Sequence, residues 1–157
     1  MEKRMEHDPF VLKEKNSVDL AQPASPFLWE LGVEMEKGGA FEARLFGTQD
    51  KGLRVGIDRE KKVVYVQRDK AEGDFSKDYA CTCQAPLCGD HSSFYLKIVC
   101  DHSSVEIFLG DGEISMTNVY LPAADHEVKL KMEAVRGKVE VKQTSVFEMR
   151  SIWKPNT

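Results

Sequence analysis

The chain has 157 residues, of which 41% are hydrophobic and 31% charged, which is the composition of a folded globular domain and not of a disordered segment. Its formal net charge of −4, with no cluster of Lys or Arg, argues against nucleic acid or an anionic membrane surface as a partner. No apolar run approaches the roughly 20 residues of a membrane-spanning helix, and a chain of this length can bury a proper hydrophobic core.

The first 25 residues predict little regular structure. They are mostly charged or small, and Pro23 and Pro26 mark the point where a hydrophobic pattern begins. We therefore expect a lead-in or linker over residues 1–25 and one β-sandwich domain over residues 26–154. The charged N-terminus has no apolar stretch behind it, so it does not predict a secretory signal peptide.

From Pro26 onward the hydrophobic residues recur with a period close to two, which is typical of β-strands. No window of a dozen residues shows the helical period of 3.6. Strands are expected at residues 27–35, 40–46, 53–57, 62–67, 94–100, 105–109, 113–120, 126–135, 138–143 and 145–153. The longest irregular stretch is expected over residues 69–93. Trp29 and Trp153 are expected to be buried aromatic anchors of the core.

The three strands between residues 94 and 120 should form one antiparallel meander. Asp111-Gly112 is a strong hairpin signal because these residues tolerate the positive φ of a tight turn. This turn and the turn at residues 101–104 pair apolar residues on one face: Leu109 with Ile114, Ile107 with Met116, Cys100 with Val105, and Ile98 with Ile107. A slip of one residue would destroy this agreement, so the register is well specified.

Short strands joined by tight turns, without intervening helices, predict an all-β fold. The expected architecture is a two-sheet antiparallel β-sandwich of the concanavalin A-like or jelly-roll type. A closed barrel is the structural alternative.

The four cysteines, Cys81, Cys83, Cys88 and Cys100, do not form the paired knuckles of a structural zinc site. Cys100 alternates in phase with the apolar residues of its strand, so it is expected to point into the core. We expect free thiols, with a disulfide or a metal site as the alternatives, and we expect neither a metal nor another cofactor. Free thiols and the lack of a signal peptide together favour a cytoplasmic location.

Residues 94–112, with the sequence FYLKIVCDHSSVEIFLGDG, resemble the signature hairpins of the C-terminal β-sandwich of glycoside hydrolase family 32, the β-fructosidases (invertases, levanases and inulinases). The family pattern there runs L-x-I-x-V-D-R-S-S-V-E-V-F-x-N-D-G. His102 replaces its Arg, and Gly110 replaces its Asn. Upstream, Arg68 matches the family's earlier hairpin, whereas Gln67 stands where an Asp is usual. The resemblance covers roughly residues 27–153.

The resemblance implies a two-sheet sandwich, and it implies that catalysis takes place elsewhere. The family's catalytic domain is a five-bladed propeller whose motifs contain Asn-Asp-Pro, Arg-Asp-Pro and Glu-Cys, and none of these occurs here. Glycoside hydrolysis needs two carboxyl groups at a fixed separation around the scissile bond. Because those carboxyl groups belong to the propeller in this family, the isolated chain is expected to have no hydrolase activity and no catalytic residue.

The leading hypothesis is therefore a non-catalytic accessory C-terminal domain of a β-fructofuranosidase-type glycoside hydrolase, which acts in sucrose or fructan metabolism and stabilises the propeller or a dimer. The partners that the resemblance implies are a family 32 catalytic propeller, in cis or in trans, and a second copy in a homodimer. The alternative hypothesis is an autonomous carbohydrate-binding module that binds fructan (levan) or fructose. Nucleic acid and membrane are not expected as partners.

Four residues are candidates for sugar contacts: Asp101, Glu106, Arg68 and Tyr120. Asp101 could bind a hydroxyl group, but an Asp that opens a turn also accepts hydrogen bonds from backbone N–H groups. Glu106 could bind a fructosyl hydroxyl or form an ion pair with Lys97 across the strands. Arg68 and Tyr120 could supply a hydrogen bond and a stacking platform, or they could cover the edge of the core.

Overall fold

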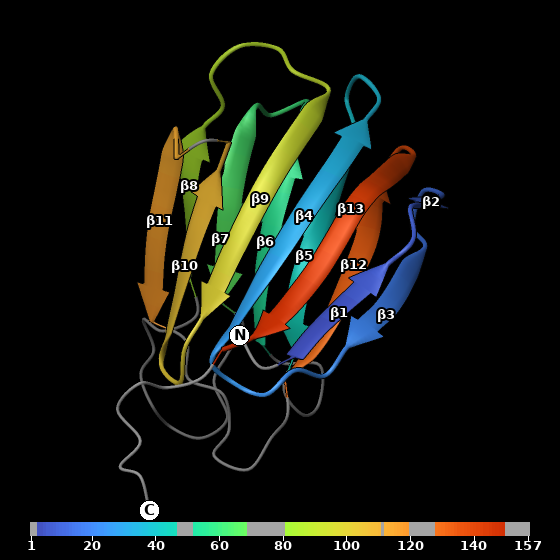
Figure 1. Cartoon of the computed structure of the whole chain (residues 1–157). Coiled ribbons are helices and arrows are strands. Elements are labelled where there is room, and N and C mark those ends of the chain that lie inside the picture. Colours follow the sequence, from blue (N-terminus) through green and yellow to red (C-terminus); the bar gives the residue numbers. More distant parts are fainter. Residues whose placement is uncertain (1–2, 47–51, 69–80, 111, 120–127, 150–157) are drawn as a thin grey trace, which may run out of the picture.

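The structure, a computed structural model of the whole chain, describes residues 3–46, 52–68, 81–110, 112–119 and 128–149. These residues form thirteen strands, and none of them is helical (Figure 1). The strands are β1 (Lys3–His7), β2 (Phe10–Leu12), β3 (Ser17–Ala21), β4 (Phe27–Met35), β5 (Ala40–Phe46), β6 (Gly52–Asp58), β7 (Val63–Arg68), β8 (Thr82–Pro86), β9 (Ser93–Cys100), β10 (Ser104–Leu109), β11 (Ile114–Val119), β12 (Lys129–Arg136) and β13 (Val139–Glu148).

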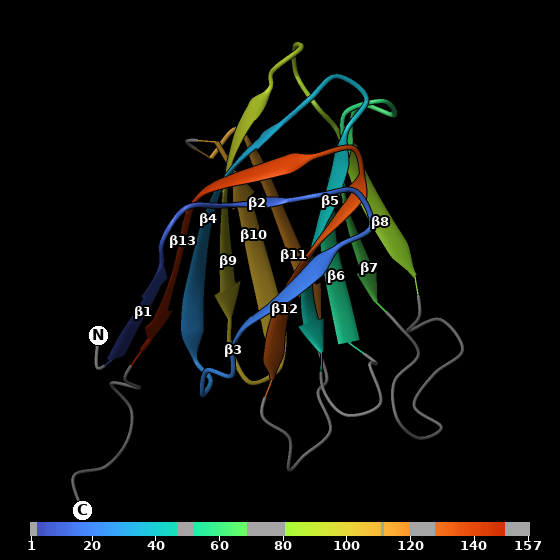
Figure 2. The ribbon, with the colours of Figure 1, turned by 90° about the vertical axis from the view of Figure 1, so that its right-hand side faces the viewer.

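The strands form two separate sheets that face each other across the core (Figures 1 and 2). Sheet A has the strand order β1-β13-β4-β9-β10-β11, with β2 also paired to β13. Sheet B has the strand order β3-β12-β5-β6-β7-β8. All the strand pairs are antiparallel. The prediction of an all-β, two-sheet antiparallel sandwich is therefore confirmed, and the barrel alternative is wrong.

Strict alternation of side chains builds the core, most clearly along β4. Its inward-facing residues are each at most 2% exposed: Phe27, Trp29, Leu31, Val33 and Met35. The indole N–H of Trp29 donates a hydrogen bond to Thr144 Oγ1 at 2.9 Å, so the polar atom of this large side chain is satisfied inside the core. The prediction that Trp29 is a buried anchor is confirmed. Trp153 lies outside the described residues.

The meander of β9, β10 and β11 has the predicted register. Its pairs are Cys100 with Val105, Ile98 with Ile107, Ile107 with Met116, and Leu109 with Ile114. Cys100 and Ile98 are 0% exposed and Ile107 is 1% exposed, whereas Ile114, on the edge strand β11, is only partly buried against the core. Alternation with a period of two was sufficient to identify the buried face because three strands agree on it.

The structure corrects the expected lead-in over residues 1–25, because β1, β2 and β3 all lie within it. β1 and β2 pair with β13 in sheet A, and β3 pairs with β12 in sheet B. Met5, Leu12 and Val18 pack against the core from these strands. The sandwich therefore begins at residue 3 and not at residue 26. Each of these strands is too short to show a clear alternation in the sequence.

Two further boundaries differ from the expectation. β13 is one strand where two were expected, and its register against β4 shifts between Val141 and Gln143, as at a β-bulge. β8 lies within the stretch expected to be irregular over residues 69–93, and it pairs with β7. The sequence of β8, Thr-Cys-Gln-Ala-Pro, has no hydrophobic alternation, so its position depends on pairing with β7.

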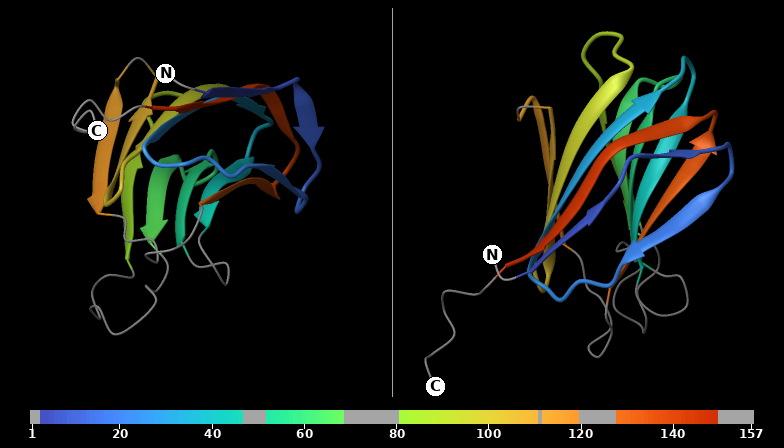
Figure 3. Two further views of the ribbon diagram at one scale, coloured as in Figure 1. Left: turned by 60° about the horizontal axis from the view of Figure 1, so that its bottom comes forward. Right: turned by 45° about the vertical axis from the view of Figure 1, so that its right-hand side comes forward.

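The two long edges of the sandwich are built differently (Figure 3). At the edge formed by β1, β2 and β3, which we call the closed edge, the chain passes between the sheets from β2 to β3 and from β12 to β13. There a ring nitrogen of His7 lies 3.1 Å from the carbonyl oxygen of Leu20, and the Lys15 N–H donates to the Ala134 carbonyl at 2.6 Å. The opposite edge, formed by β8 and β11, we call the open edge.

Candidate functional site

Three of the four predicted sugar-contact residues are described, and they lie near one end of the sandwich, where β7, β9 and β11 end (Figure 1). Arg68 is the last residue of β7, Asp101 directly follows β9, and Glu106 lies near the start of β10. Tyr120 follows β11 and lies outside the described residues. The three described side chains make different contacts.

Asp101 opens the turn between β9 and β10. Its backbone N–H donates to the Ser104 carbonyl at 2.9 Å, and its carboxylate accepts a hydrogen bond from the His102 N–H at 2.7 Å. This is the turn chemistry that the sequence allowed as the alternative to sugar binding. Asp101 is exposed, so its outer carboxylate lone pairs still face solvent.

Glu106 is exposed on the outer face of sheet A, between Val99 and Thr117 in register. The ion pair with Lys97 that the register allowed is not formed among the residues that the structure describes. Instead, the Lys97 ammonium lies over the Tyr95 ring, 5.6 Å from its centroid. Glu106 is therefore a solvated carboxylate on a flat sheet surface.

Arg68 clamps the two sheets together across the open edge. Its guanidinium donates to Cys81 Sγ at 2.8 Å and to the Val119 carbonyl at 3.4 Å. Its backbone N–H donates to the Cys81 carbonyl at 2.9 Å. Because Val119 belongs to sheet A and Arg68 to sheet B, this contact is structural. It agrees with the reading of Arg68 as a residue that covers the edge of the core.

A polar network that the sequence did not predict lies on the outer face of sheet B. Arg44 pairs with Glu42 at 3.0 Å and with Glu133, so one guanidinium joins β5 to β12. The Tyr65 ring lies flat on Gly56, because a Cβ atom at Gly56 would be 2.1 Å from its Cζ. Burial, followed by the charge and the hydrogen bond of Glu42, raises the pKa of Tyr65. The network links neighbouring strands of sheet B through side chains.

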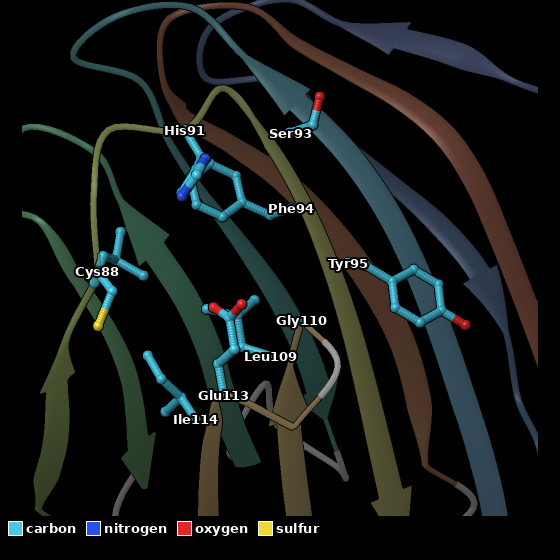
Figure 4. A pocket seen from close by; sticks show the side chains of 10 residues that line it. Cys88, His91, Ser93, Phe94, Tyr95, Leu109, Gly110, Glu113 and Ile114 are labelled. Atoms are coloured by element: carbon cyan, nitrogen blue, oxygen red, sulfur yellow. The ribbon is translucent and has the colours of Figure 1, made fainter.

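A pocket of about 340 Å³ lies at the other end of the open edge (Figure 4). One wall is the loop that joins β8 to β9, and the other is the turn that joins β10 to β11. The residues that line it are Leu87, Cys88, His91, Ser93, Phe94, Tyr95, Leu109, Gly110, Glu113 and Ile114. Phe94 and Leu109 belong to the core, with exposures of 9% and 7%, so the pocket reaches the hydrophobic interior.

The sequence analysis did not identify this pocket. Its walls come from the stretch expected to be irregular and from a turn that was read only as a hairpin signal. One signal was present: Gly110, Asp111 and Gly112 make the turn glycine-rich, and Gly110 and Gly112 adopt φ of 66° and 89°. None of the three described sugar-contact candidates is among the residues that line this pocket.

The four cysteines have free thiols, with Cys100 buried and Cys83 and Cys88 exposed. The inward orientation predicted for Cys100 is confirmed. Within the described ranges, no three His, Cys, Asp or Glu side chains lie close enough together to hold a metal ion. The same part of the chain contains no helix that is long and apolar enough to cross a membrane.

A sequence model described as "Glycosyl hydrolases family 32 C terminal" matches residues 3–148. The levanase of Bacillus subtilis (strain 168) is 32% identical over 127 residues, which cover 79% of this chain and 18% of the levanase. The extracellular exo-inulinase inuE of Aspergillus niger (strain ATCC MYA-4892 / CBS 513.88 / FGSC A1513) is 35% identical over 101 residues, which cover 62% of this chain and 18% of the inulinase. The chain thus spans less than a fifth of the length of these relatives.

The crystal structure of exo-inulinase from Aspergillus awamori has the same fold over 97% of this chain and 30% of its own, with a TM-score of 0.76 and 22% identity. The family match starts at residue 3, so it includes the three N-terminal strands that the resemblance over roughly residues 27–153 left out. The match covers nearly every strand of the sandwich. The chain therefore belongs to the C-terminal domain family of glycoside hydrolase family 32.

Proposed function

We propose that this chain is the non-catalytic accessory domain of a β-fructofuranosidase-type glycoside hydrolase and that it binds and stabilises a family 32 catalytic domain, in cis or in trans. The main support for the proposal is the fraction of each relative's length that this chain matches. It matches a C-terminal family model over residues 3–148 but spans only 18% of the levanase of Bacillus subtilis. Most of the length of such an enzyme therefore lies outside the region that resembles this chain.

Three of the described carboxyl groups, Asp58, Asp90 and Glu140, are not suited to donate a proton to a leaving group. A glycosidase needs one carboxylic acid with a raised pKa to protonate the leaving group. Burial alone would raise the pKa of Asp58, but hydrogen bonds from Arg136 and from backbone N–H groups outweigh it and lower this pKa. Hydrogen bonds and opposite charges from Arg59 and from Lys142 likewise lower the pKa of Asp90 and of Glu140. These groups are carboxylates near neutral pH, not proton donors.

We expect a partner domain to pack against a short row of three partly covered apolar side chains on the outer face of sheet A. Phe147, Leu28 and Val99 are cross-strand neighbours on β13, β4 and β9. Leu28 and Val99 are half-buried, and Phe147 is covered by the Arg4 guanidinium, 5.0 Å from the ring centroid. Apolar side chains in a continuous row on an outer sheet face are suited to packing against another domain.

Two experiments test the proposal. The purified chain is incubated with sucrose, inulin and levan, and no reducing sugar should be released; measurable turnover would refute a non-catalytic role. The chain is then mixed with the separately produced catalytic part of the Bacillus subtilis levanase. We expect co-elution on gel filtration and a catalytic-domain Tm that rises with the concentration of added chain, because binding to the folded state stabilises it. Independent elution with an unchanged Tm would refute the accessory role.

A matched pair of variants locates the contact. Leu28→Asp places a charge within the apolar row and should abolish co-elution. Val11→Asp changes an apolar residue that is 55% exposed at the closed edge, and it should leave co-elution unchanged. Equal behaviour of the two variants would exclude the outer face of sheet A as the contact surface.

A further inference from the structure

The pocket at the open edge is lined by both apolar and polar side chains, and this combination limits the class of ligand that it can bind. Phe94, Leu109 and Ile114 form an apolar floor and side, and the Glu113 carboxylate and the His91 imidazole stand over it. Figure 4 shows both polar groups on the same side of β9 as Phe94, whereas Tyr95 points across the opposite side of the strand. Small-ligand sites commonly combine an apolar surface with a few convergent polar groups.

The loop wall of the pocket is fixed at three points. The Leu87 N–H donates to the Lys62 carbonyl at 2.9 Å, and the Ser92 carbonyl accepts from the Met35 N–H at 2.9 Å. Between them, Asp90 accepts from Arg59 at 3.0 Å, and the same guanidinium donates to the Met35 carbonyl at 2.7 Å. The loop is therefore held to β4 and to the β6–β7 turn before any ligand arrives, which lowers the entropic cost of binding.

The turn wall is held as well. The Gly110 N–H donates to the Tyr95 carbonyl at 2.9 Å, which extends the β9–β10 ladder by one residue to the start of the turn. Gly110 has φ of 66°, and a Cβ atom there would lie 3.4 Å from the Glu113 carboxyl carbon. The glycine permits this backbone conformation, which a side chain would strain. The loop wall of the pocket is preorganised, and Gly110 at the start of the turn wall is fixed to β9.

The lining disfavours three classes of ligand. An anion would face the Glu113 carboxylate, in a chain of net charge −4. A purely apolar ligand would desolvate a carboxylate and an imidazole without giving either a partner. An organic cation would find one aromatic ring, Phe94, which is only 9% exposed, in place of an aromatic cage.

The geometry points to a neutral cyclic polyol of monosaccharide size as the ligand of this pocket. Hydroxyl groups can donate to the Glu113 carboxylate and accept from the His91 ring N–H, and the C–H face of the ring can cover Leu109 and Ile114. The volume of about 340 Å³ is near the lower end of ligand pockets, which suits one ring and not an oligosaccharide. This assignment does not depend on the accessory role proposed above.

Cys88 allows the proposal to be tested directly, because its thiol is exposed and lines the pocket, while exposed Cys83 on β8 does not line it. The full chain is alkylated with iodoacetamide, and the rate at each cysteine is read by mass spectrometry. D-fructose or D-glucose, at up to about 100 mM because single-ring sites bind in the millimolar range, should slow alkylation of Cys88 at least about twofold while Cys83 is unchanged. Absence of protection by both sugars would overturn the proposal, and so would equal protection of Cys83.

Ligand and variant controls complete the test. Open-chain sorbitol and anionic gluconate should protect Cys88 weakly or not at all, and protection equal to that of the rings would overturn the proposal. Glu113→Gln should raise the sugar concentration needed for half-maximal protection about tenfold, the effect of losing a hydrogen bond to a charged group. Glu106→Gln, an exposed carboxylate outside the pocket, should protect like the wild type. If Glu106→Gln abolishes protection and Glu113→Gln does not, the sugar binds elsewhere and the proposal is wrong.

Discussion

The closed and the open edges of the sandwich differ in what joins the two sheets. At the closed edge the backbone itself crosses from sheet to sheet, and Leu12 is buried there with 7% exposure. At the open edge β8 and β11 face each other (Figure 3), and the links between the sheets that the described residues form there include the Arg68 clamp at one end and the β8–β9 loop, a wall of the pocket, at the other. The main chain thus crosses between the sheets twice at the closed edge, whereas at the open edge it crosses in the β8–β9 loop and the Arg68 side chain adds a second link.

Because of this difference, we expect the closed edge to contribute most to folding stability and the open edge to give a ligand access to the pocket. A cavity next to the core costs stability, because core atoms at its wall lose packing partners. The fold places that cost at the open edge, where Phe94 and Leu109 line the pocket, and it closes the opposite edge with three additional strands. Changes at the closed edge should therefore act on folding, and changes at the open edge should act mainly on access and local motion.

The largest effect is expected from removing residues 1–21, which deletes β1, β2 and β3. Buried apolar side chains stabilise a fold by about 1.5–3 kcal/mol each, and a domain has only about 5–15 kcal/mol in total. Met5, Leu12 and Val18 would all be lost. The truncated chain should show no cooperative thermal transition by circular dichroism. A Tm within a few degrees of the full chain would show that the closed edge contributes little to folding.

A matched pair of core truncations compares the two edges directly. Leu12→Ala at the closed edge should cost about 2–5 kcal/mol in the free energy of unfolding, the usual range for a buried leucine. Ile114→Ala at the open edge should cost about 1–2 kcal/mol, because Ile114 is only partly buried and the enlarged pocket opens to water. Urea unfolding at constant pH measures both. A larger loss at Ile114 would reverse the assignment of stability to the closed edge.

The two regions also differ in how well the sequence predicted them. The register of residues 94–119 followed from alternation because each strand is six to eight residues long and three strands agree on one buried face. β1–β3 were missed because they are three to five residues long and each offers only one or two inward positions, too few to establish a period of two. The structure of these strands is decided by pairing with β12 and β13.

The candidate site was harder to predict than the fold. Arg68 and Asp101 were selected because they match a sequence motif. In the structure, Arg68 links the two sheets and Asp101 accepts a hydrogen bond in a turn. The pocket depends on hydrogen bonds between distant segments, such as Leu87 with Lys62 and Ser92 with Met35. No local pattern encodes such contacts, so the pocket became visible only in the folded chain.

Alkaline pH tests how well the sandwich excludes water from the core around Cys100 on β9. Burial, offset in part by a hydrogen bond with Ser25 and assisted by the charge of Asp101, raises the pKa of the Cys100 thiol from 9.0 to about 12. The unfolded thiol ionises above about pH 9 and the folded thiol does not, so this contribution to stability is complete below pH 9 and is lost as the pH rises toward 12.

The wild type should therefore lose about 2–3 kcal/mol more than Cys100→Ala between pH 9 and pH 11, at 1.36 kcal/mol for each pH unit. Unfolding midpoints in urea at several pH values measure the difference. Tyr65 is present in both proteins, so its own raised pKa cancels from the comparison. Parallel pH profiles would mean that water reaches the Cys100 thiol in the folded state.

The smallest effect is expected at the Arg68 clamp. Arg68→Met keeps the apolar stem but removes the hydrogen bonds to Cys81 Sγ and the Val119 carbonyl, which should cost about 1 kcal/mol. Because the clamp joins β7 to the end of β11, amide hydrogen exchange should become faster in β11 and stay unchanged in β1. Lys97→Met, on the outer face of sheet A, is the control and should alter neither strand. Faster exchange in β1 as well would mean that the two edges open as one cooperative unit. The proposed difference between the closed and the open edge would then be wrong.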